Sequence, residues 1–247
     1  MTEEKKERIA KVIAAAGVCS RRDAEAWIEA GRVKVNGTKL QTPAFTVSDE
    51  DVITIDGRPI PKKKATKMWL YHKPAGLVTT ARDPEGRPTV FENLPRSLGR
   101  VISIGRLDLN SEGLLLLTNN GGLSRHLELP QTGLAREYRV RVNGEIFQED
   151  VDALAKGVTV DGVQYRGIDM YPESDFVKGK NQWIRVVLHE GKNREIRKVM
   201  NAMGLSVNRL IRLSYGPFEL GRLPLNKTME VDPSLLKTFY KTIGFKE

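Results

Sequence analysis

One short segment of the chain gathers the residue types that acid–base or nucleophilic chemistry needs. It reads GRLDLNSEGLLLLTNNG from Gly105, and it places Asp108 in a polar loop between two apolar stretches, Val101–Ile104 and Leu114–Thr118. A carboxylate in a loop between two buried strands is held rigidly and can face a cleft. From residue chemistry alone, Asp108 can be a nucleophile, a general base or a hydrogen-bond acceptor that ties the loop together, and the last role is favoured.

Two further segments carry aromatic or cationic side chains at regular spacing. Tyr138 lies in REYRVRV, whose alternation predicts a strand, and by itself it is best explained as a half-buried strand tyrosine. In EGKNREIRKVMNAMG, Arg194, Arg197 and Lys198 are three and four residues apart, so a helix there would carry all three cations on one face. Arg194 and Lys198 are expected to contact phosphate or to be solvated.

Other catalytic classes find little support. The chain has no G-x-x-x-x-G-K-[ST] and no G-x-G-x-x-G, so a phosphate-cradling nucleotide site is not indicated. His72, His126 and His189 are far apart, and we expect no metal site. The single cysteine, Cys19, excludes a disulfide framework and is expected to be a small half-buried thiol at a helix boundary.

The charge balance points to a polyanionic partner. Lys and Arg number 40 against 31 Asp and Glu, which gives a net charge of +9, in a chain that is 40% hydrophobic and therefore has a core. This composition excludes a disordered, collagen-like or coiled-coil protein. The N-terminus lacks the apolar core of a secretory signal, and no stretch approaches the 18 apolar residues of a membrane span. We expect a cytoplasmic protein with no membrane partner.

The pattern of elements predicts an α+β protein in two parts: residues 5–60, a proline-bounded basic linker over 61–67, and residues 68–247. The first part is expected to contain helices over 7–16 and from Ser20 to Gly31, then strands over 32–35 and 52–55. The second is expected to form a mixed, mainly antiparallel sheet. Its predicted strands are 68–71, 101–104, 114–118, 137–142, 167–171, 183–188 and 209–214, and its predicted helices are 123–128, 148–156, 193–203 and 234–243.

The first part resembles the S4 RNA-binding domain. The resemblance rests on two short helices, a basic start of the second helix and the segment EAGRVKVNG, and it covers about a quarter of the chain. It implies that Arg21, Arg22, Arg32 and Lys34, which cluster with Lys39 around the second helix and first strand, contact RNA. A helical hairpin with a solvated charged face is the alternative.

The rest of the chain resembles the pseudouridine synthases, in the branch that carries an S4 domain and modifies ribosomal RNA. Four segments match in order: KPAGLVTTARDPEGRPTVFENLP (residues 73–95), GRLDLNSEGLLLLTNNG, REYRVRV and EGKNREIRKVMNAMG. The resemblance implies that Asp108 is the nucleophile, that Tyr138 packs on the target base and that Arg197 pairs with Asp108. Arg106 remains a candidate RNA contact.

The reaction that the resemblance implies detaches uracil from N1 and rejoins it to the ribose through C5. It includes no redox or phosphoryl-transfer step, so we expect no cofactor and no metal, and a monomer acting on ribosomal RNA. Attack at C1′, attack at C6 and a glycal route all stay open. RLIRLSYGPFELGRLPLNKTMEV and DPEGRPTVFENLP favour the large-subunit synthase B type and 23S RNA. The alternatives are a 16S enzyme and a non-catalytic RNA-binding assembly protein. A DNA-binding regulator is not supported, because the sequence shows no recognition helix with base-reading side chains.

Overall fold

The structure, a computed structural model, describes residues 6–173 and 181–246, so the expected outer boundaries at 5 and 247 lie outside the described residues. The chain folds into two compact units. The first contains the described residues up to Lys67 together with 95–102 and 119–121. The second contains 68–94, 103–118 and the described residues from Gly122 onward.

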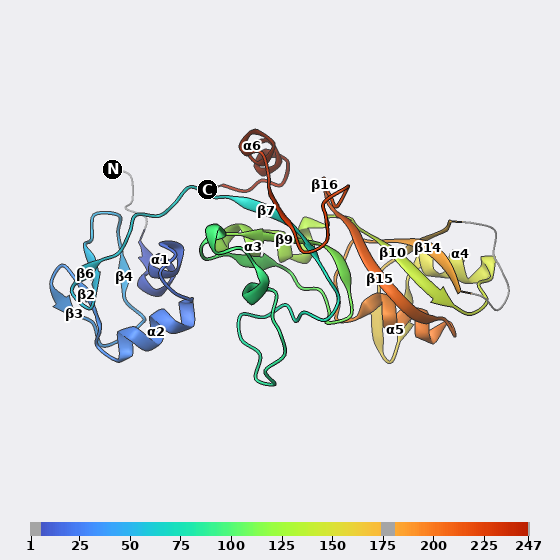
Figure 1. Ribbon diagram of the computed structural model, residues 1–247, viewed down its shortest axis with the longest axis horizontal. Coiled ribbons are helices and arrows are strands. Elements are labelled where there is room, and N and C mark those ends of the chain that lie inside the picture. Colours follow the sequence, from blue (N-terminus) through green and yellow to red (C-terminus); the bar gives the residue numbers. More distant parts are fainter. Residues whose placement is uncertain (1–5, 174–180, 247) are drawn as a thin grey trace. The chain divides into compact units, whose positions relative to one another are not determined.

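The first unit has two helices and a small antiparallel sheet (Figure 1). The elements are α1 (Ile9–Ala15), α2 (Arg21–Glu29), the pair β1 (Glu7–Arg8) and β4 (Thr46–Val47), the sheet β3 (Thr38–Lys39), β2 (Val33–Val35), β5 (Ile53–Ile55) and β6 (Arg58–Pro59), and the 3-10 helix η2 (Arg96–Leu98). Helix α2 starts where its sequence predicts, because Ser20 and Asp23 form a reciprocal capping box. Ile9, Ile13 and Ile28 are completely buried and pack against Val33.

The second unit is built on one nine-stranded sheet. Its main path runs β13 (Asp169–Pro172), β14 (Asn181–Leu188), β10 (Arg136–Asn143), β15 (Ser206–Tyr215), β9 (Glu112–Thr118), β7 (Met68–Lys73) and β17 (Thr228–Glu230), with β8 (Ile102–Ile104) beside β9 and β16 (Phe218–Glu219) beside β15. The main-path neighbours pair antiparallel except β9 and β15, which are parallel. The α+β class with a mixed, mainly antiparallel sheet is therefore confirmed.

Helices pack against the strands at both ends of the sheet, near β13 and β15 and near β7 and β9. The remaining elements are α3 (Gly121–Glu128), α4 (Gln148–Lys156), α5 (Glu195–Ala202), α6 (Pro233–Thr242), the hairpin β11 (Val158–Val160) and β12 (Val163–Tyr165), and the 3-10 helices η1 (Phe91–Asn93) and η3 (Pro130–Thr132). Helix α5 packs against β15 and α4 against β13, while α3 and α6 share a core with β7 and β9 (Figure 1). Residues of α5 and of the neighbouring strands therefore meet on one face.

The parallel join of β9 and β15 depends on a glycine. Gly113 lies opposite Arg212 with φ of +101°, and a Cβ atom there would be 2.3 Å from the Arg212 carbonyl oxygen. Only glycine allows the two backbones to approach so closely and adopts this φ without strain. This join brings the loop before β9, which carries Asp108, next to the strand that pairs with Tyr138 on β10.

Candidate active site

Asp108 lies in the short connection between β8 and β9, and neighbouring segments hold that connection on two sides. The Ser111 N–H donates to the Asp108 carbonyl at 3.0 Å, which closes a tight turn. The Thr79 hydroxyl donates to the Leu107 carbonyl at 2.7 Å and accepts from the Leu107 N–H. The Asp108 side chain is 32% exposed, so the braced loop presents its carboxylate to solvent.

Lys73, the last residue of β7, supports the same loop from the inside. Its side chain is completely buried, and its ammonium donates to the carbonyl oxygens of Ser111 at 2.8 Å, Pro74 at 2.9 Å, Asp108 at 3.1 Å and Leu109 at 3.3 Å. Burial lowers the pKa of Lys73 to about 8, although the charges of Asp108 and Glu112 oppose this shift. No role was predicted for Lys73 from the sequence. Its position at the end of a predicted apolar strand could have indicated a buried lysine with a structural or functional role.

The arginine that pairs with Asp108 is not the one that the sequence predicted. Arg194 Nη1 lies 3.3 Å from Asp108 Oδ2, whereas Arg197 donates to the carbonyls of Val207 at 3.1 Å and Asn110 at 3.2 Å. The predicted Arg197–Asp108 pair is therefore wrong as an ion pair. Asp108 Oδ1 accepts no hydrogen bond from the described residues.

The backbone explains this exchange of roles. Helix α5 begins at Glu195, and Arg194 precedes it in a left-handed conformation with φ of 51°. Arg194 consequently does not share a helix face with Arg197 and Lys198, as the spacing had predicted. Arg197 is half-buried, and burial lowers its pKa together with the neighbouring Arg194 charge, while Asp108 raises it.

Tyr138 lies in the same cleft as Asp108. It is 8% exposed on β10, where the residues at alternate positions face the interior, and it stands opposite Arg212 of β15. Arg106, Arg194 and Arg197 also line this cleft, whose volume is about 920 Å³. Lys198 is exposed and is not among the residues that line it.

Two arginines and a tyrosine form the part of the cleft next to Tyr138. The guanidinium groups of Arg136 and Arg212 lie 4.5 and 5.4 Å from the centre of the Tyr215 ring, a cation–π arrangement. Arg212 is 2% exposed and donates to the Leu114 carbonyl at 2.7 Å. Sequence reasoning missed this cluster, although the alternation that predicts β10 places Arg136 on the same face as Tyr138.

A carboxylate network holds the backbone that carries Arg194. Glu195 accepts from the Lys192 N–H at 2.9 Å, and the Lys192 ammonium lies 2.5 Å from Glu190, which also accepts from the Arg166 N–H. Burial raises the pKa of Glu195 to about 7. Burial opposes ionisation of Glu190 as well, yet its hydrogen bonds to Lys192 and Arg166 keep its pKa below the usual range.

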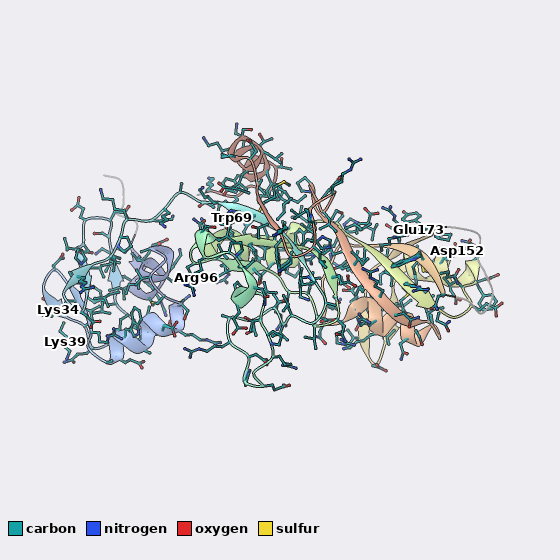
Figure 2. All side chains as sticks on the ribbon, in the orientation of Figure 1. Lys34, Lys39, Trp69, Arg96, Asp152 and Glu173 are labelled. Atoms are coloured by element: carbon teal, nitrogen blue, oxygen red, sulfur yellow. The ribbon has the colours of Figure 1, made fainter. Side chains whose placement is uncertain are left out.

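The predicted RNA contacts of the first unit differ in their surroundings. Arg32 is held by Asp56 through two nitrogens and stacks on the Trp27 ring, and Arg21 pairs with Glu25 at 3.2 Å. Arg22 and Lys34 are exposed. Lys34 lies directly opposite Lys39 on neighbouring strands, and Figure 2 shows both side chains at the surface of this unit.

Two negative findings apply to the described ranges, 6–173 and 181–246. No group of three or more His, Cys, Asp or Glu side chains is gathered there in a way that could hold a metal ion. Within the same ranges, none of the helices has both the length and the apolar character needed to cross a bilayer. The side chains that line the cleft and could take part in chemistry are carboxylates, tyrosines and several guanidinium groups.

Comparisons with known proteins agree on one family. The family model described as RNA pseudouridylate synthase matches residues 67–202, and that of the S4 domain matches residues 7–53. Ribosomal large subunit pseudouridine synthase B of Pseudomonas aeruginosa is 41% identical, with 97% of this chain and 63% of that protein covered. The enzyme of the same name from Vibrio cholerae is 42% identical, with 92% and 72% covered.

A relative with higher identity and a solved structure with lower identity indicate the same family and fold. An RNA pseudouridine synthase of Rickettsia bellii is 48% identical, with 94% of this chain and 99% of that protein covered. A crystal structure of a pseudouridylate synthase matches with a TM-score of 0.66 at 24% identity, covering 93% of this chain and 98% of that one, and so has the same fold. The resemblances stated from the sequence motifs are confirmed.

Proposed function

The chain belongs to the RNA pseudouridylate synthase family, in the group with an N-terminal S4 domain, and we propose that it isomerises one uridine of large-subunit ribosomal RNA with Asp108 as its nucleophile. The preference for 23S RNA rests on the synthase B relatives at 41–42% identity over more than nine-tenths of the chain. The enzyme would act as a monomer in the cytoplasm, during ribosome maturation.

The proposed reaction breaks the N1–C1′ bond and forms a C5–C1′ bond. N1 gains a proton and C5 loses one, so the product has the composition of the substrate and no oxidant or phosphoryl donor is consumed. Asp108 would attack C1′ or C6, or would assist a glycal route. Tyr138 would stack on the uracil after its extrusion from the RNA, because an aromatic ring replaces part of the stacking that the base loses.

One observation carries this proposal: the Asp108 carboxylate, one oxygen of which accepts no hydrogen bond from the part of the chain that the structure describes, opens into the cleft that Tyr138 lines. Lys73 and Thr79 fix the loop of Asp108, so the position of the carboxylate is set before RNA arrives. Arg194 neutralises one carboxylate oxygen without burying it. A structural aspartate that only tied its loop together would direct both oxygens to loop N–H groups.

RNA would be held mainly through its backbone, by the cations of the first unit and of the cleft. All four predicted cations of the first unit are exposed, and Arg22 and Lys34 are the two that form no ion pair among the described residues. Like charges directly opposite each other on neighbouring strands are destabilising, so the Lys34 and Lys39 pair favours an anionic partner at that surface. Arg106 would contribute from the cleft, and Lys198 from outside its lining.

The test uses ribosomal RNA transcripts that carry tritium at uracil C5. Formation of the C5–C1′ bond releases this tritium to water, so the count of released tritium reports isomerisation. We expect release from the large-subunit transcript and none from the small-subunit transcript. Asp108→Asn, which is nearly isosteric but cannot act as an anionic nucleophile, should keep its thermal unfolding curve and release none.

If the wild-type protein releases no tritium from either transcript, the proposed isomerisation is wrong and the alternative, a non-catalytic RNA-binding assembly protein, is favoured. Release from the small-subunit transcript alone would reassign the substrate, and near-normal release by Asp108→Asn would remove Asp108 from the chemistry.

A further inference from the structure

Two glutamates, Glu190 and Glu195, are hydrogen-bonded to each other through their carboxyl groups just before and at the start of α5. Both are buried, since Glu190 is 9% exposed and Glu195 is 3% exposed. An ionised carboxylate only accepts hydrogen bonds, so two carboxyl groups bond to each other only when one of them holds a proton. The contact therefore requires one proton between the two side chains.

The surroundings of the two carboxyl groups assign this proton to Glu195. Glu190 accepts from the Arg166 N–H at 2.9 Å and from the Lys192 ammonium at 2.5 Å, and these donors favour its ionised form. Glu195 accepts the Lys192 N–H at Oε2, whereas its Oε1 is buried and has no donor among the described residues. A buried carboxylate oxygen without a donor is unfavourable, but a protonated carboxyl group donates instead. Burial raises the pKa of Glu195 to about 7, which agrees with this assignment.

The charged groups that face this pair come from two segments. Lys192 lies in the connection before α5, with its ammonium 5.4 Å from the centre of the Tyr165 ring of β12, and Arg166 Nε lies 4.0 Å from Glu190 Oε2. Strand β11, which packs on α5, contains only valine and threonine. The titratable side chains of β15, the other strand packed on α5, are bonded elsewhere: Arg209 to Glu112, Arg212 to the Leu114 carbonyl and Tyr215 to the Leu127 carbonyl.

The pair belongs to the backbone turn at residues 192–195, called the Arg194 turn here. The Lys192 N–H donates to the Glu195 carboxyl at 2.9 Å, and the Glu195 N–H donates back to the Lys192 carbonyl at 3.3 Å. The Lys192 ammonium also donates to the Gln164 carbonyl at 2.9 Å, which ties the turn to the hairpin β11–β12. Arg194 lies inside this turn, and Arg197 lies in the first turn of α5. Both arginines that contact the β8–β9 connection therefore start from this backbone.

We propose that Glu190 and Glu195 share one proton, held by Glu195, and that this proton keeps the Arg194 turn in the shape that isomerisation requires. With the proton present, the turn holds Arg194 on the Asp108 carboxylate and Arg197 on the loop that carries it. Loss of the proton to solvent leaves two adjacent carboxylates, which repel each other and loosen the turn. Glu195 is a positioning residue, because it acts through the two arginines and does not touch the RNA. The inference rests on the proposed function, since isomerisation is the activity that the proton would control.

The rate of isomerisation should consequently fall as the pH rises. The midpoint should lie at or above the pKa of Glu195, which is about 7, because the negative charge of bound RNA disfavours a second carboxylate. Lys73, whose pKa burial lowers to about 8, is another group that could cause such a decline. Glu195→Gln separates the two explanations, because its amide does not titrate, donates to Glu190 and still accepts the Lys192 N–H.

The experiment measures the single-turnover rate of tritium release at saturating enzyme between about pH 6 and about pH 9, on the large-subunit transcript tritiated at uracil C5. Wild type should lose about tenfold in rate for each pH unit above the midpoint. Glu219→Gln, at an exposed glutamate of the same unit that does not line the cleft, is the matched control and should show the same decline. In Glu195→Gln the ratio of the rates at about pH 6 and about pH 8.5 should be about tenfold smaller than in wild type.

Two further measurements separate positioning from folding and from RNA binding. Glu195→Leu has no hydrogen bond to offer Glu190, so its rate at about pH 6 should be about tenfold below that of wild type, with RNA affinity within about threefold. Infrared spectra at about pH 6 and about pH 8.5 should differ by the C=O band of one protonated carboxyl group, and this band should be missing in Glu195→Gln. Denaturant titrations at each pH exclude loss of the fold.

Four results would overturn the shared proton as a positioning device: a wild-type rate that does not fall with pH, an undiminished decline in Glu195→Gln, a normal rate in Glu195→Leu, or the absence of the carboxyl band. A wild-type protein that shows the band but releases no tritium at any pH would instead refute the proposed function. Since the infrared band is measured without the reaction, the two failures are distinguishable.

Discussion

The two arginines near Asp108 hold different parts of the site, and their removal should have different consequences. Arg197 is half-buried and donates to the carbonyls of Asn110 and Val207, so it links the loop that carries Asp108 to the start of β15. The Arg194 side chain is 51% exposed, and within residues 6–173 and 181–246 its one polar partner is the carboxylate of Asp108. Exposed ion pairs contribute about 0–1 kcal/mol, so Arg194 adds little to the stability of the fold.

We therefore expect Arg197→Ala to be nearly inactive in a single turnover at saturating enzyme while it still binds RNA. Arg197→Lys should be intermediate or poor, because one ammonium does not reproduce the planar fork that reaches two carbonyls. Arg194→Ala should keep the rate within about tenfold, the size of one exposed charge contact. The single-turnover rate and the RNA affinity should be measured on the same proteins. A preserved rate with lost affinity in Arg197→Ala would show that Arg197 contacts an RNA phosphate and does not position the loop of Asp108.

Glu195 provides a pH test at the residue scale. Burial raises its pKa to about 7 from an unfolded value near 4.5, so between these pH values the folded state holds a proton that the unfolded state releases. Its contribution to stability is full below about pH 4.5 and is lost as the pH rises through about 7. Glu195→Gln does not titrate and keeps an oxygen for the Lys192 N–H.

The free energy of unfolding of Glu195→Gln should consequently exceed that of wild type by about 1–3 kcal/mol at pH 8, and the difference should shrink toward pH 4.5. Denaturant titrations of both proteins at several pH values measure it. A difference that does not change with pH would mean that Glu195 is ionised throughout.

At the scale of elements, β7 supports the loop that carries Asp108 through one buried lysine, Lys73. Lys73→Met keeps the length of the side chain but leaves up to four carbonyl oxygens without their donor. Unsatisfied buried polar groups are destabilising, so unfolding should become easier by about 1–3 kcal/mol, after the relief of burying a charge is included. The catalytic rate should fall further than RNA affinity, because the loop of Asp108 loses its support.

Lys227→Met, at an exposed position of the same unit, is the matched control and should leave stability and rate unchanged. If Lys73→Met matches this control in tritium release, the buried ammonium has no part in positioning Asp108.

The helices and strands of this protein could be predicted from its sequence better than the contacts between them. Hydrophobic periodicity places α4 at Gln148–Lys156 as predicted, and the Ser20 capping box starts α2. The side-by-side position of β9 and β15 was not predictable, because Gly113 and Arg212 are distant in sequence and a glycine in a strand pattern does not name its neighbour. The family motifs predicted that Asp108 and Tyr138 belong to one site, and both line the same cleft. Which arginine pairs with Asp108 was not predictable, because it depends on the left-handed backbone of Arg194, and residue spacing does not reveal that conformation.

At the scale of the whole molecule, the net charge of +9 is distributed over two compact units. The second unit uses many of its cleft cations internally, on Asp108, Glu190 and backbone carbonyls. The first unit has a cationic start of α2 and the opposed pair Lys34 and Lys39 at its surface. Affinity for RNA should therefore depend strongly on the first unit, and the rate of isomerisation on the second.

Reversal of Arg21 and Arg22 to Glu tests this division. Both lie in the first turn of α2, where glutamate is favourable to the helix dipole, so the fold should persist even though Arg21 loses its pair with Glu25. Each lost phosphate contact should lower the salt slope of RNA binding by about 0.7 to 0.9, with the single-turnover rate at saturating enzyme preserved. Lys237→Glu with Lys241→Glu on α6 makes the same change in net charge at exposed positions of the second unit. An equal loss of affinity in both double variants would show that total charge, and not the surface of α2, attracts the RNA.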